Sequence, residues 1–256
     1  MFMVTEQALT GQRVLVTRPL AQSAKMASLI DEAGGQAICF PVIHIEPLPA
    51  TDWLTDNLDQ ADWLIFVSRN ALESFVSGWS EALPSQLKLA AVGDATASAM
   101  QAAGLSVDCQ PQRSTGSDGL LQMPEMQDVD GQKMIIVRGQ GGRERLADTL
   151  KARGASIDYM EVYRRDLPSP DRQDCIHAMY ADKLVCTSAA GIDNLCRLLS
   201  EFKAELLYKP LVVVSDRLKQ HAHGLGFRWV EVSDNASDSA VLQTLTEMDK
   251  QHGKQR

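Results

Sequence analysis

The residues that could do chemistry in this chain of 256 residues are small, hydroxylic or basic, and each group follows a short apolar run. If the runs are buried strands of open α/β sheets, these residues lie at the carboxyl ends of the strands, where such sheets bind ligands. Helices that begin there add unpaired backbone N–H groups and the positive end of a helix dipole. The pattern predicts pockets for anions, with these candidates: Thr17, Arg18, Ser68, Asn70, Gly93, Arg138, Gly139, Gly142, Ser188 and Ser215.

Each serine in this set has a second interpretation. A serine before a helix also serves as an N-cap, a role that contributes about 1 kcal/mol to helix stability. For a single serine the cap is the better interpretation, whereas six groups at equivalent strand ends favour ligand binding. The set contains no convincing pair of nucleophile and base, so nucleophilic catalysis is not indicated.

The loop at 138–143 is the richest of these groups, with the sequence RGQGGR. Gly139, Gly141 and Gly142 would let the backbone come close to a carboxylate or a phosphate. The spacing is not that of a dinucleotide fingerprint, because the third glycine would fall at Glu144. The loop also lacks the Gly-Lys-Ser/Thr of a P-loop, so nucleotide binding is not indicated.

Tyr163 lies in an extended segment at 162–168, beside Arg164, Arg165 and Asp166. A phenol normally titrates near pH 10, so at neutral pH it is a hydrogen-bond donor and a weak general acid. The alternative is a tyrosine that only covers a linker.

The five histidines and the cysteine spacings form no metal-binding pattern, so neither a metal nor an organic cofactor is expected.

The sequence indicates two related halves at a shift of 120 residues; the alternative is that any two α/β segments rich in valine and leucine look alike. Residues 11–13 (GQR) align with 131–133 (GQK), Arg18 with Arg138, and 62–68 with 182–188. Apolar runs alternate with helix-like segments in both halves, which predicts parallel sheets covered on both faces. The expected strands are 14–16, 37–40, 63–67, 89–92, 107–109, 134–137, 157–160, 184–187, 211–214 and 229–232. The expected helices are one that ends at 34–35, then 69–77, 94–103, 118–123, 143–153, 171–180, 190–202, 216–224 and 237–249.

Composition excludes several classes of function. The net charge of −8 and an aromatic content of 5% argue against binding of nucleic acid. No apolar run is long enough to span a membrane, and the N-terminus does not resemble a signal peptide. The five cysteines are odd in number and scattered, which favours reduced, buried thiols in a cytoplasmic protein. Residues 1–10 are expected to form a loose leader and 250–256 a frayed tail.

The ordered set of motifs resembles the uroporphyrinogen-III synthase family of tetrapyrrole biosynthesis. The similarity extends from about residue 11 to 245, and its strongest parts are VRGQGGRE with EVYRR. The matching segments are VLVTRP (14–19), PVIHIEPLP (41–49), DWLIFVSRNA (62–71), AAVGDATASAM (90–100), VRGQGGRE (137–144), YMEVYRRDLP (159–168), LVCTSAAGI (184–192) and VVVSDRL (212–218).

The resemblance implies an α/β fold of two doubly wound, flavodoxin-like parallel-sheet domains joined by a two-stranded connector. One domain would be discontinuous, at 1–41 and 169–256, and the other would be 49–161, with connecting strands at 42–48 and 162–168. Each half of the repeat would give its first strand–helix–strand to one domain and the remainder to the other. The active site would lie in a cleft between domains that move about a hinge, in a monomeric enzyme.

The resemblance also implies a reaction without a cofactor. Hydroxymethylbilane, a linear tetrapyrrole, would be closed to a ring with inversion of ring D and loss of water through a spiro intermediate. Tyr163 would donate a hydrogen bond to the departing hydroxyl, and the candidate residues at strand ends would hold the substrate's carboxylates. The partners would be this small molecule and, transiently, the hydroxymethylbilane synthase that supplies it, with no nucleic acid and no membrane.

Two rival interpretations stay open at this point. One is a non-catalytic two-domain protein that binds a small polycarboxylate or other organic anion in an interdomain cleft. The other is a nucleotide-dependent enzyme that uses the loop at 138–143 for phosphate, against which the failed glycine spacing counts.

Overall fold

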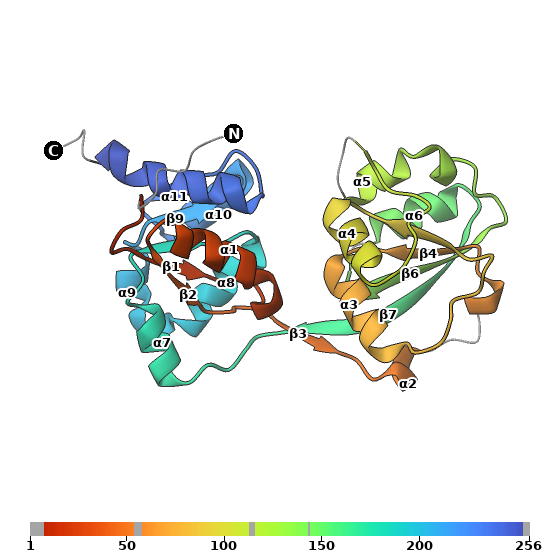
Figure 1. Ribbon diagram of the computed structural model, residues 1–256, viewed down its shortest axis with the longest axis horizontal. Coiled ribbons are helices and arrows are strands. Elements are labelled where there is room, and N and C mark those ends of the chain that lie inside the picture. Colours follow the sequence, from red (N-terminus) through yellow and green to blue (C-terminus); the bar gives the residue numbers. More distant parts are fainter. Residues whose placement is uncertain (1–7, 54–57, 113–115, 143, 253–256) are drawn as a thin grey trace. The chain divides into compact units, whose positions relative to one another are not determined.

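The computed structural model describes residues 8–53, 58–112, 116–142 and 144–252 (Figure 1). The chain forms two compact units, which we call unit 1 (Met1–His44 with Asp166–Arg256) and unit 2 (Ile45–Arg165). Each unit contains one five-stranded sheet, and every strand pair whose register is resolved runs parallel. The chain is therefore of the α/β class, as the alternation of apolar runs and helical segments predicts.

The sheet of unit 1 has the strand order β10-β9-β8-β1-β2. Its strands are short, and their residues are apolar on both faces because helices cover both sides. Helices α1 and α11 pack together on one face, and α8 and α10 pack on the other (Figure 1). The strands are β1 (Arg13–Val16), β2 (Gln36–Cys39), β8 (Lys183–Val185), β9 (Leu211–Val213) and β10 (Val230–Val232). The helices are α1 (Leu20–Glu32), α7 (Arg172–Ala178), α8 (Ala189–Leu198), the 3-10 turn Ser200–Phe202, α9 (Lys203–Leu206), α10 (Asp216–Leu225) and α11 (Asp238–His252).

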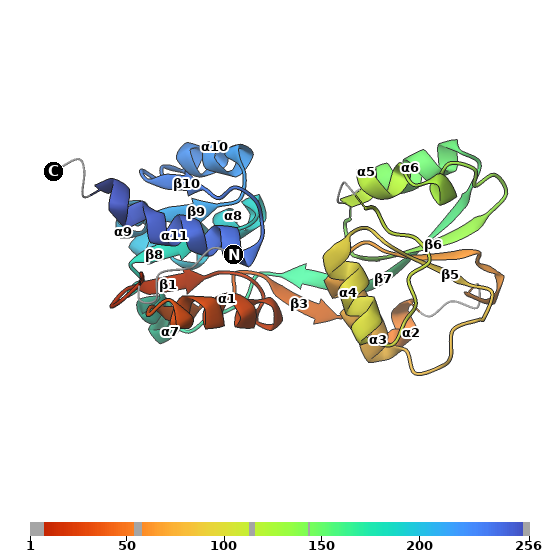
Figure 2. The ribbon, with the colours of Figure 1, turned by 45° about the horizontal axis from the view of Figure 1, so that its top comes forward.

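The sheet of unit 2 has the order β3-β7-β6-β4-β5. Helices α3 and α4 cover one face and α5 and α6 the other, which buries a separate apolar cluster on each side (Figure 2). The strands are β3 (His44–Pro47), β4 (Trp63–Phe66), β5 (Lys88–Ala91), β6 (Lys133–Gly139) and β7 (Ser156–Asp166). The helices are α2 (Ala50–Trp53), α3 (Arg69–Gly78), α4 (Asp94–Ala102), α5 (Gly116–Leu121), α6 (Arg145–Ala152) and the 3-10 turns Leu58–Gln60 and Pro124–Met126.

Four strands of each sheet have equivalent orders once the sequence repeat is taken into account. In the repeat, β6 and β7 correspond to β1 and β2, whereas β4 and β5 correspond to β8 and β9. The segment β9-β8-β1-β2 of one sheet thus matches β5-β4-β6-β7 of the other. Each sheet therefore combines the first strand–helix–strand of one half of the sequence with later strands of the other half.

Several expected elements differ from the structure. The expected strand at 107–109 is reduced to one isolated bridge between Ala90 and Cys109. Helices α2 and α9 were not expected, because four residues are too few to show a helical period. Strand β7 continues to Asp166, into the segment at 162–168 expected to be a separate connector, because it pairs with β3. Cys39 is exposed and Cys175 and Cys196 are half-buried, so the expectation of buried thiols is confirmed for Cys109 and Cys186 and wrong for the others.

Some expectations fall on residues that the structure does not describe. These are the helix start at Arg143, Ser114 in the loop before α5, most of the leader at 1–10 and the end of the tail at 253–256. In the described part of the chain, no helix combines the length and apolar character needed to cross a membrane.

Candidate functional site

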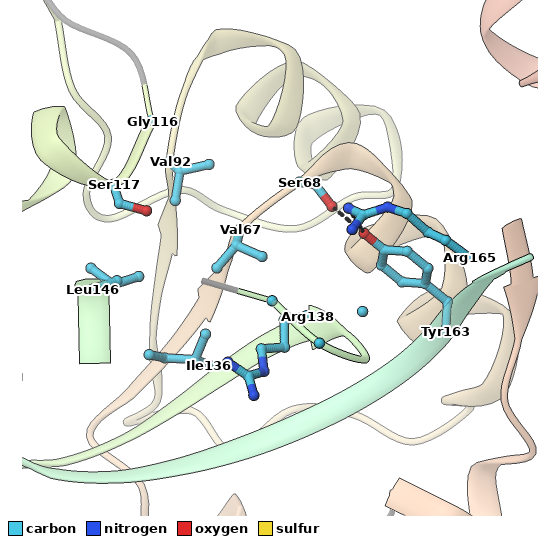
Figure 3. A pocket seen from close by; sticks show the side chains of 13 residues that line it. Val67, Ser68, Val92, Gly116, Ser117, Ile136, Arg138, Leu146, Tyr163 and Arg165 are labelled. Atoms are coloured by element: carbon cyan, nitrogen blue, oxygen red, sulfur yellow. Dashed lines mark hydrogen bonds between the residues drawn. The ribbon is translucent and has the colours of Figure 1, made fainter. Parts of the chain in front are cut away.

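A pocket of about 480 Å³ lies within unit 2, at the carboxyl ends of β4, β5 and β6 (Figure 3). This is the edge of a parallel sheet at which α/β proteins bind ligands. Its apolar wall consists of Val67, Val92, Ile136 and Leu146. Its polar lining contains side chains and glycine backbone from several elements, namely Ser68, Gly116, Ser117, Arg138, Gly139, Gly141, Gly142, Tyr163 and Arg165.

Tyr163 is completely buried and lies against Gly139. The register of β6 against β7 shifts between Arg138 and Gly139, which brings Gly139 opposite Tyr163. A Cβ atom on Gly139 would lie 2.4 Å from Cζ of the tyrosine ring, a distance that no real contact tolerates. The glycine at this position therefore creates the space that the Tyr163 ring occupies.

The hydroxyl of Tyr163 belongs to a small polar group with Ser68 and Arg165. Nη2 of Arg165 donates to the phenol oxygen at 2.8 Å, and Oγ of Ser68 lies 3.5 Å from it (Figure 3). The Arg165 guanidinium also lies 5.3 Å from the centroid of the tyrosine ring. Because Arg165 donates to the oxygen, the phenol's own proton remains available to a different acceptor.

Arg138 lines the pocket but is already bound by two carboxylates. Its guanidinium contacts Glu144 at 2.7 Å and Glu161 at 3.0 Å, and it stacks 3.6 Å above the ring of Tyr159. Burial acts to lower the pKa of Arg138, but hydrogen bonds to Glu144 and Glu161 leave it raised. The guanidinium points away from the hydroxyl of Tyr163 (Figure 3).

Tyr159 completes the cluster around Arg138. Burial and a hydrogen bond to Glu144 raise the pKa of Tyr159 to about 12, so the phenol is neutral at physiological pH. The same bond from Tyr159, together with that from Arg138, lowers the pKa of Glu144. Arg138 thus has charged local partners, and the cluster fixes the loop that starts at Gly139.

The three predicted serines all act as helix N-caps. The Oγ atoms of Ser68, Ser188 and Ser215 accept from backbone N–H groups three residues later, at 3.1, 3.0 and 3.4 Å. Gly93 occupies the same position before α4 without a side-chain cap, and Asn70 lies in the first turn of α3. Ser68 is the member of this set that also lines the pocket of unit 2.

The predicted candidates of unit 1 are engaged within that unit. Oγ1 of Thr17 donates to the carbonyl of Val185 at 2.7 Å, and Arg18 forms an ion pair with Asp238 at the start of α11. Ser188 and Ser215 begin α8 and α10. Unit 2 contains Ser68, Asn70, Gly93, Arg138, Gly139, Gly142 and Tyr163, and of these the pocket brings together Ser68, Arg138, Gly139, Gly142 and Tyr163.

Arg165 is a charged pocket residue that the sequence analysis did not select as a candidate. The signal was present, because residues two apart on a strand share one face. Tyr163 and Arg165 therefore point to the same side of β7, while Arg164 points away and pairs with Glu46 at 2.7 Å.

As for metals, the described residues contain no group of three histidines, cysteines or acids able to hold an ion.

The comparisons with known proteins agree with one another. The family described as "Uroporphyrinogen-III synthase HemD" matches residues 24–243. Uroporphyrinogen-III synthase of Escherichia coli is 32% identical over 243 residues, which cover 91% of this chain and 99% of that protein. The enzyme of Salmonella typhimurium is 32% identical over 248 residues, covering 91% and 99%.

Solved structures show the same fold at lower identity. The uroporphyrinogen-III synthetase of Helicobacter pylori matches with a TM-score of 0.63 at 12% identity, covering 93% of this chain and 99% of that one. A mutant uroporphyrinogen III synthase of Thermus thermophilus matches with a TM-score of 0.59 at 19% identity, covering 94% and 100%. With the family match extending over most of its length, this chain belongs to the uroporphyrinogen-III synthase family.

Proposed function

We propose that this chain closes hydroxymethylbilane to uroporphyrinogen III, with inversion of ring D and release of water. Membership of the family makes it a lyase of tetrapyrrole biosynthesis. The single observation that supports a chemical role for unit 2 is the pocket in which the Tyr163 hydroxyl meets Ser68 and Arg165. This arrangement offers a proton donor beside an apolar wall, which suits a pyrrole ring with a departing hydroxyl.

The reaction needs one proton and a folded substrate. The carbon–oxygen bond of the hydroxymethyl group breaks, its electron pair leaves with oxygen, and a proton completes the water molecule. The remaining cation is attacked by the substituted carbon of ring D, which gives a spiro intermediate that fragments and closes again with the ring inverted. The carbon of ring D that closes the macrocycle then loses its proton, which restores a neutral pyrrole and balances the proton given to water. The linear substrate also closes spontaneously without inversion, so the enzyme's main contribution is to position it.

Tyr163 is our candidate for the group that assists departure of the hydroxyl. Its oxygen already accepts from Arg165, so its proton can be donated to an acceptor in the pocket. General-acid assistance of this kind contributes about 10²- to 10⁴-fold, and the low end is expected because the departure is intrinsically easy. Gly139 supports this role by leaving room for the ring.

The substrate carries two carboxylates on each of four rings, and we propose that main-chain N–H groups and hydroxyls bind many of them. Candidates in unit 2 are Ser68, Asn70, Gly93, Gly139 and Gly142, and those in unit 1 are Thr17, Arg18, Ser188 and Ser215. Arg138 remains a candidate from the sequence, although Glu144 and Glu161 already bind its guanidinium.

The test is an assay of the product isomer. Purified protein is incubated with freshly made hydroxymethylbilane, and the type I and type III isomers are separated. We expect type III from the protein and type I from buffer alone; type I as the sole product in both samples would refute the proposal. Tyr163→Phe is expected to lower turnover with little change in folding, whereas Tyr159→Phe, on the same strand but bonded to Glu144, is the matched control.

The same assay separates the alternatives. A non-catalytic polycarboxylate-binding protein would give no type III isomer, and family membership does not favour that interpretation. The expected domain bounds, the cytoplasmic location, the monomeric state and a transient contact with hydroxymethylbilane synthase remain proposals. Size-exclusion chromatography with light scattering measures the oligomeric state directly.

A further inference from the structure

We propose that Arg165 forms a carboxylate-binding subsite in the pocket of unit 2, where its guanidinium holds one acidic arm of the substrate next to the Tyr163 hydroxyl. The inference deepens the proposed function, because the identity of the ligand rests on it. The arrangement of the pocket residues does not depend on the proposed function. It suits any ligand that combines a flat apolar ring with a carboxylate.

Arg165 lines the pocket with a charge that no carboxylate neutralises in the described part of the chain. Its contacts there are the hydrogen bond to the Tyr163 oxygen at 2.8 Å and the ring of the same residue. The Tyr163 hydroxyl carries no negative charge, so it does not neutralise the Arg165 guanidinium. The positive charge therefore remains available to a ligand in the pocket. Arg165 is also exposed, which makes the guanidinium accessible to a ligand.

The neighbouring arginines differ from Arg165 in this respect. Glu144 and Glu161 both bind Arg138, Glu46 binds Arg164 at 2.7 Å, and Asp118 binds Arg145 at 2.7 Å. A ligand carboxylate at Arg138 would have to compete with two carboxylates of the protein. At Arg165 it would meet a guanidinium without such competition.

The guanidinium has enough donors to serve both the tyrosine and a ligand. Of its five N–H groups, one is directed to Tyr163, and a carboxylate needs two in a bidentate pair. Ser68 and Tyr163 add two hydroxyls at the same place (Figure 3). The apolar side chains of Val67 and Val92 also line the pocket, so one ligand can place a ring on them and an acidic arm on Arg165.

An arm held in this way is bound before and during the reaction, so its loss should appear mainly in KM. Charge-assisted hydrogen bonds of this type predict an increase in KM of about ten- to a hundredfold for Arg165→Met. Arg165→Lys should have an intermediate effect, because lysine keeps the charge but lacks the planar fork. The matched control is Arg164→Met, which removes the adjacent arginine on the opposite side of β7.

The experiment measures steady-state KM and kcat with hydroxymethylbilane, and the Kd of uroporphyrinogen III by anaerobic equilibrium dialysis. Circular dichroism and thermal melting accompany each variant. Weaker binding of uroporphyrinogen III by Arg165→Met, but not by Arg164→Met, supports the subsite. Wild-type KM and Kd in Arg165→Met would overturn it. If Arg165→Met does not fold, Arg165→Gln is compared with Arg165→Lys: equal Kd values for both variants and wild type refute the subsite.

Combining Arg165→Met with Tyr163→Phe distinguishes ligand binding by Arg165 from orientation of the Tyr163 hydroxyl by Arg165. If Arg165 acts only by orienting the Tyr163 hydroxyl, the effect of Arg165→Met should disappear in Tyr163→Phe, which has no hydroxyl to orient. We expect the increase in KM and Kd to persist there, and its disappearance would overturn the subsite. A wild-type protein that binds uroporphyrinogen III through Arg165 but forms no type III isomer would refute the proposed function and leave the subsite standing.

Discussion

The two units share the order of four of their five strands but differ at the residues that follow them. At the shift of 120, unit 1 has Pro19 where unit 2 has Gly139, and Ile43 where unit 2 has Tyr163. In unit 2, the absent Cβ of Gly139 leaves room for the tyrosine ring. The difference teaches that the sheet supplies a position, and that two substituted residues decide which side chain occupies it.

The residues that both units share have a different role. Arg18 and Arg138 are equivalent in the repeat, both side chains are largely buried, and both form ion pairs within their own unit. An arginine that is repeated with local counter-ions in each copy is best explained as part of the fold. Arg165 is not shared in this way, because the corresponding residue in the other copy is Ile45.

The largest effect should come from Gly139→Ala, which tests the difference between the units. The new methyl group would lie 2.4 Å from Cζ of Tyr163, so the ring must move. A displacement of about 1 Å in a reacting group can lower turnover by about 100-fold. The added volume should also reduce the free energy of unfolding by about 1–3 kcal/mol. Turnover and urea unfolding measure the two effects.

Gly224→Ala is the matched control for this substitution. Gly224 lies in α10, and a methyl group added there meets no atom within 4 Å. Since alanine is the better helix former, this variant should be at least as stable as the wild type. Wild-type turnover in Gly139→Ala would show that the position of the Tyr163 ring does not matter for the reaction.

The next effect concerns the shared arginines. Arg18→Met should lower the free energy of unfolding by about 1–2 kcal/mol, because it leaves the partly buried Asp238 without its partner. Arg138→Met should have a smaller effect, since Glu144 and Glu161 are more exposed. Urea unfolding measures both values. From the sequence alone, loss of Arg138 is expected mainly to raise KM. If Arg138→Met raises KM and leaves stability as in the wild type, Arg138 binds the substrate and is not mainly structural.

Much of the fold could be predicted from the sequence because buried parallel strands are short apolar runs between helices. The run at 63–66 and the run at 134–137 are strands for this reason. The short helices α2 and α9 could not be predicted, since four residues show no period. The bounds of β7 were missed because its continuation past Val162 depends on pairing with neighbours, which a single sequence does not display.

The candidate site was predictable in part. Tyr163 and Gly139 could be selected by residue type and position, but their contact depends on a register shift between β6 and β7 that has no sequence signal. Arg138 was selected as a ligand for its charge, although Glu144 and Glu161 neutralise it from either side. Charge alone therefore does not show which guanidinium is available to a ligand, and only the partners of each arginine distinguish Arg138 from Arg165.

Alkaline pH should weaken both units through one buried thiol in each. Burial raises the pKa of Cys186 in unit 1 to about 12, and burial with the nearby Glu125 does the same for Cys109 in unit 2. The ordinary value in the unfolded chain is 9.0, so folding favours the neutral thiol. This stabilisation is complete below pH 9 and is lost between about 9 and 12, at about 1.4 kcal/mol per pH unit for Cys186.

Urea unfolding between pH 8.5 and 10.5 measures this slope. Cys186→Ala should lower the free energy of unfolding at all pH values, because it leaves a small cavity, but it should flatten the alkaline slope. Cys109→Ala should flatten it as well. An unchanged slope in both variants would assign the alkaline loss of stability to other groups.

The smallest expected effects test whether each of three equivalent serines only caps a helix or also contributes to the reaction. Ser68, Ser188 and Ser215 each cap a helix, so substitution by alanine should lower the free energy of unfolding by about 1 kcal/mol in each case. Ser68 alone of the three lies 3.5 Å from the Tyr163 hydroxyl. We therefore expect Ser68→Ala to lower kcat in addition to its effect on stability, and Ser188→Ala to leave kcat as in the wild type. Equal kcat values for both variants would show that Ser68 is a cap and nothing more.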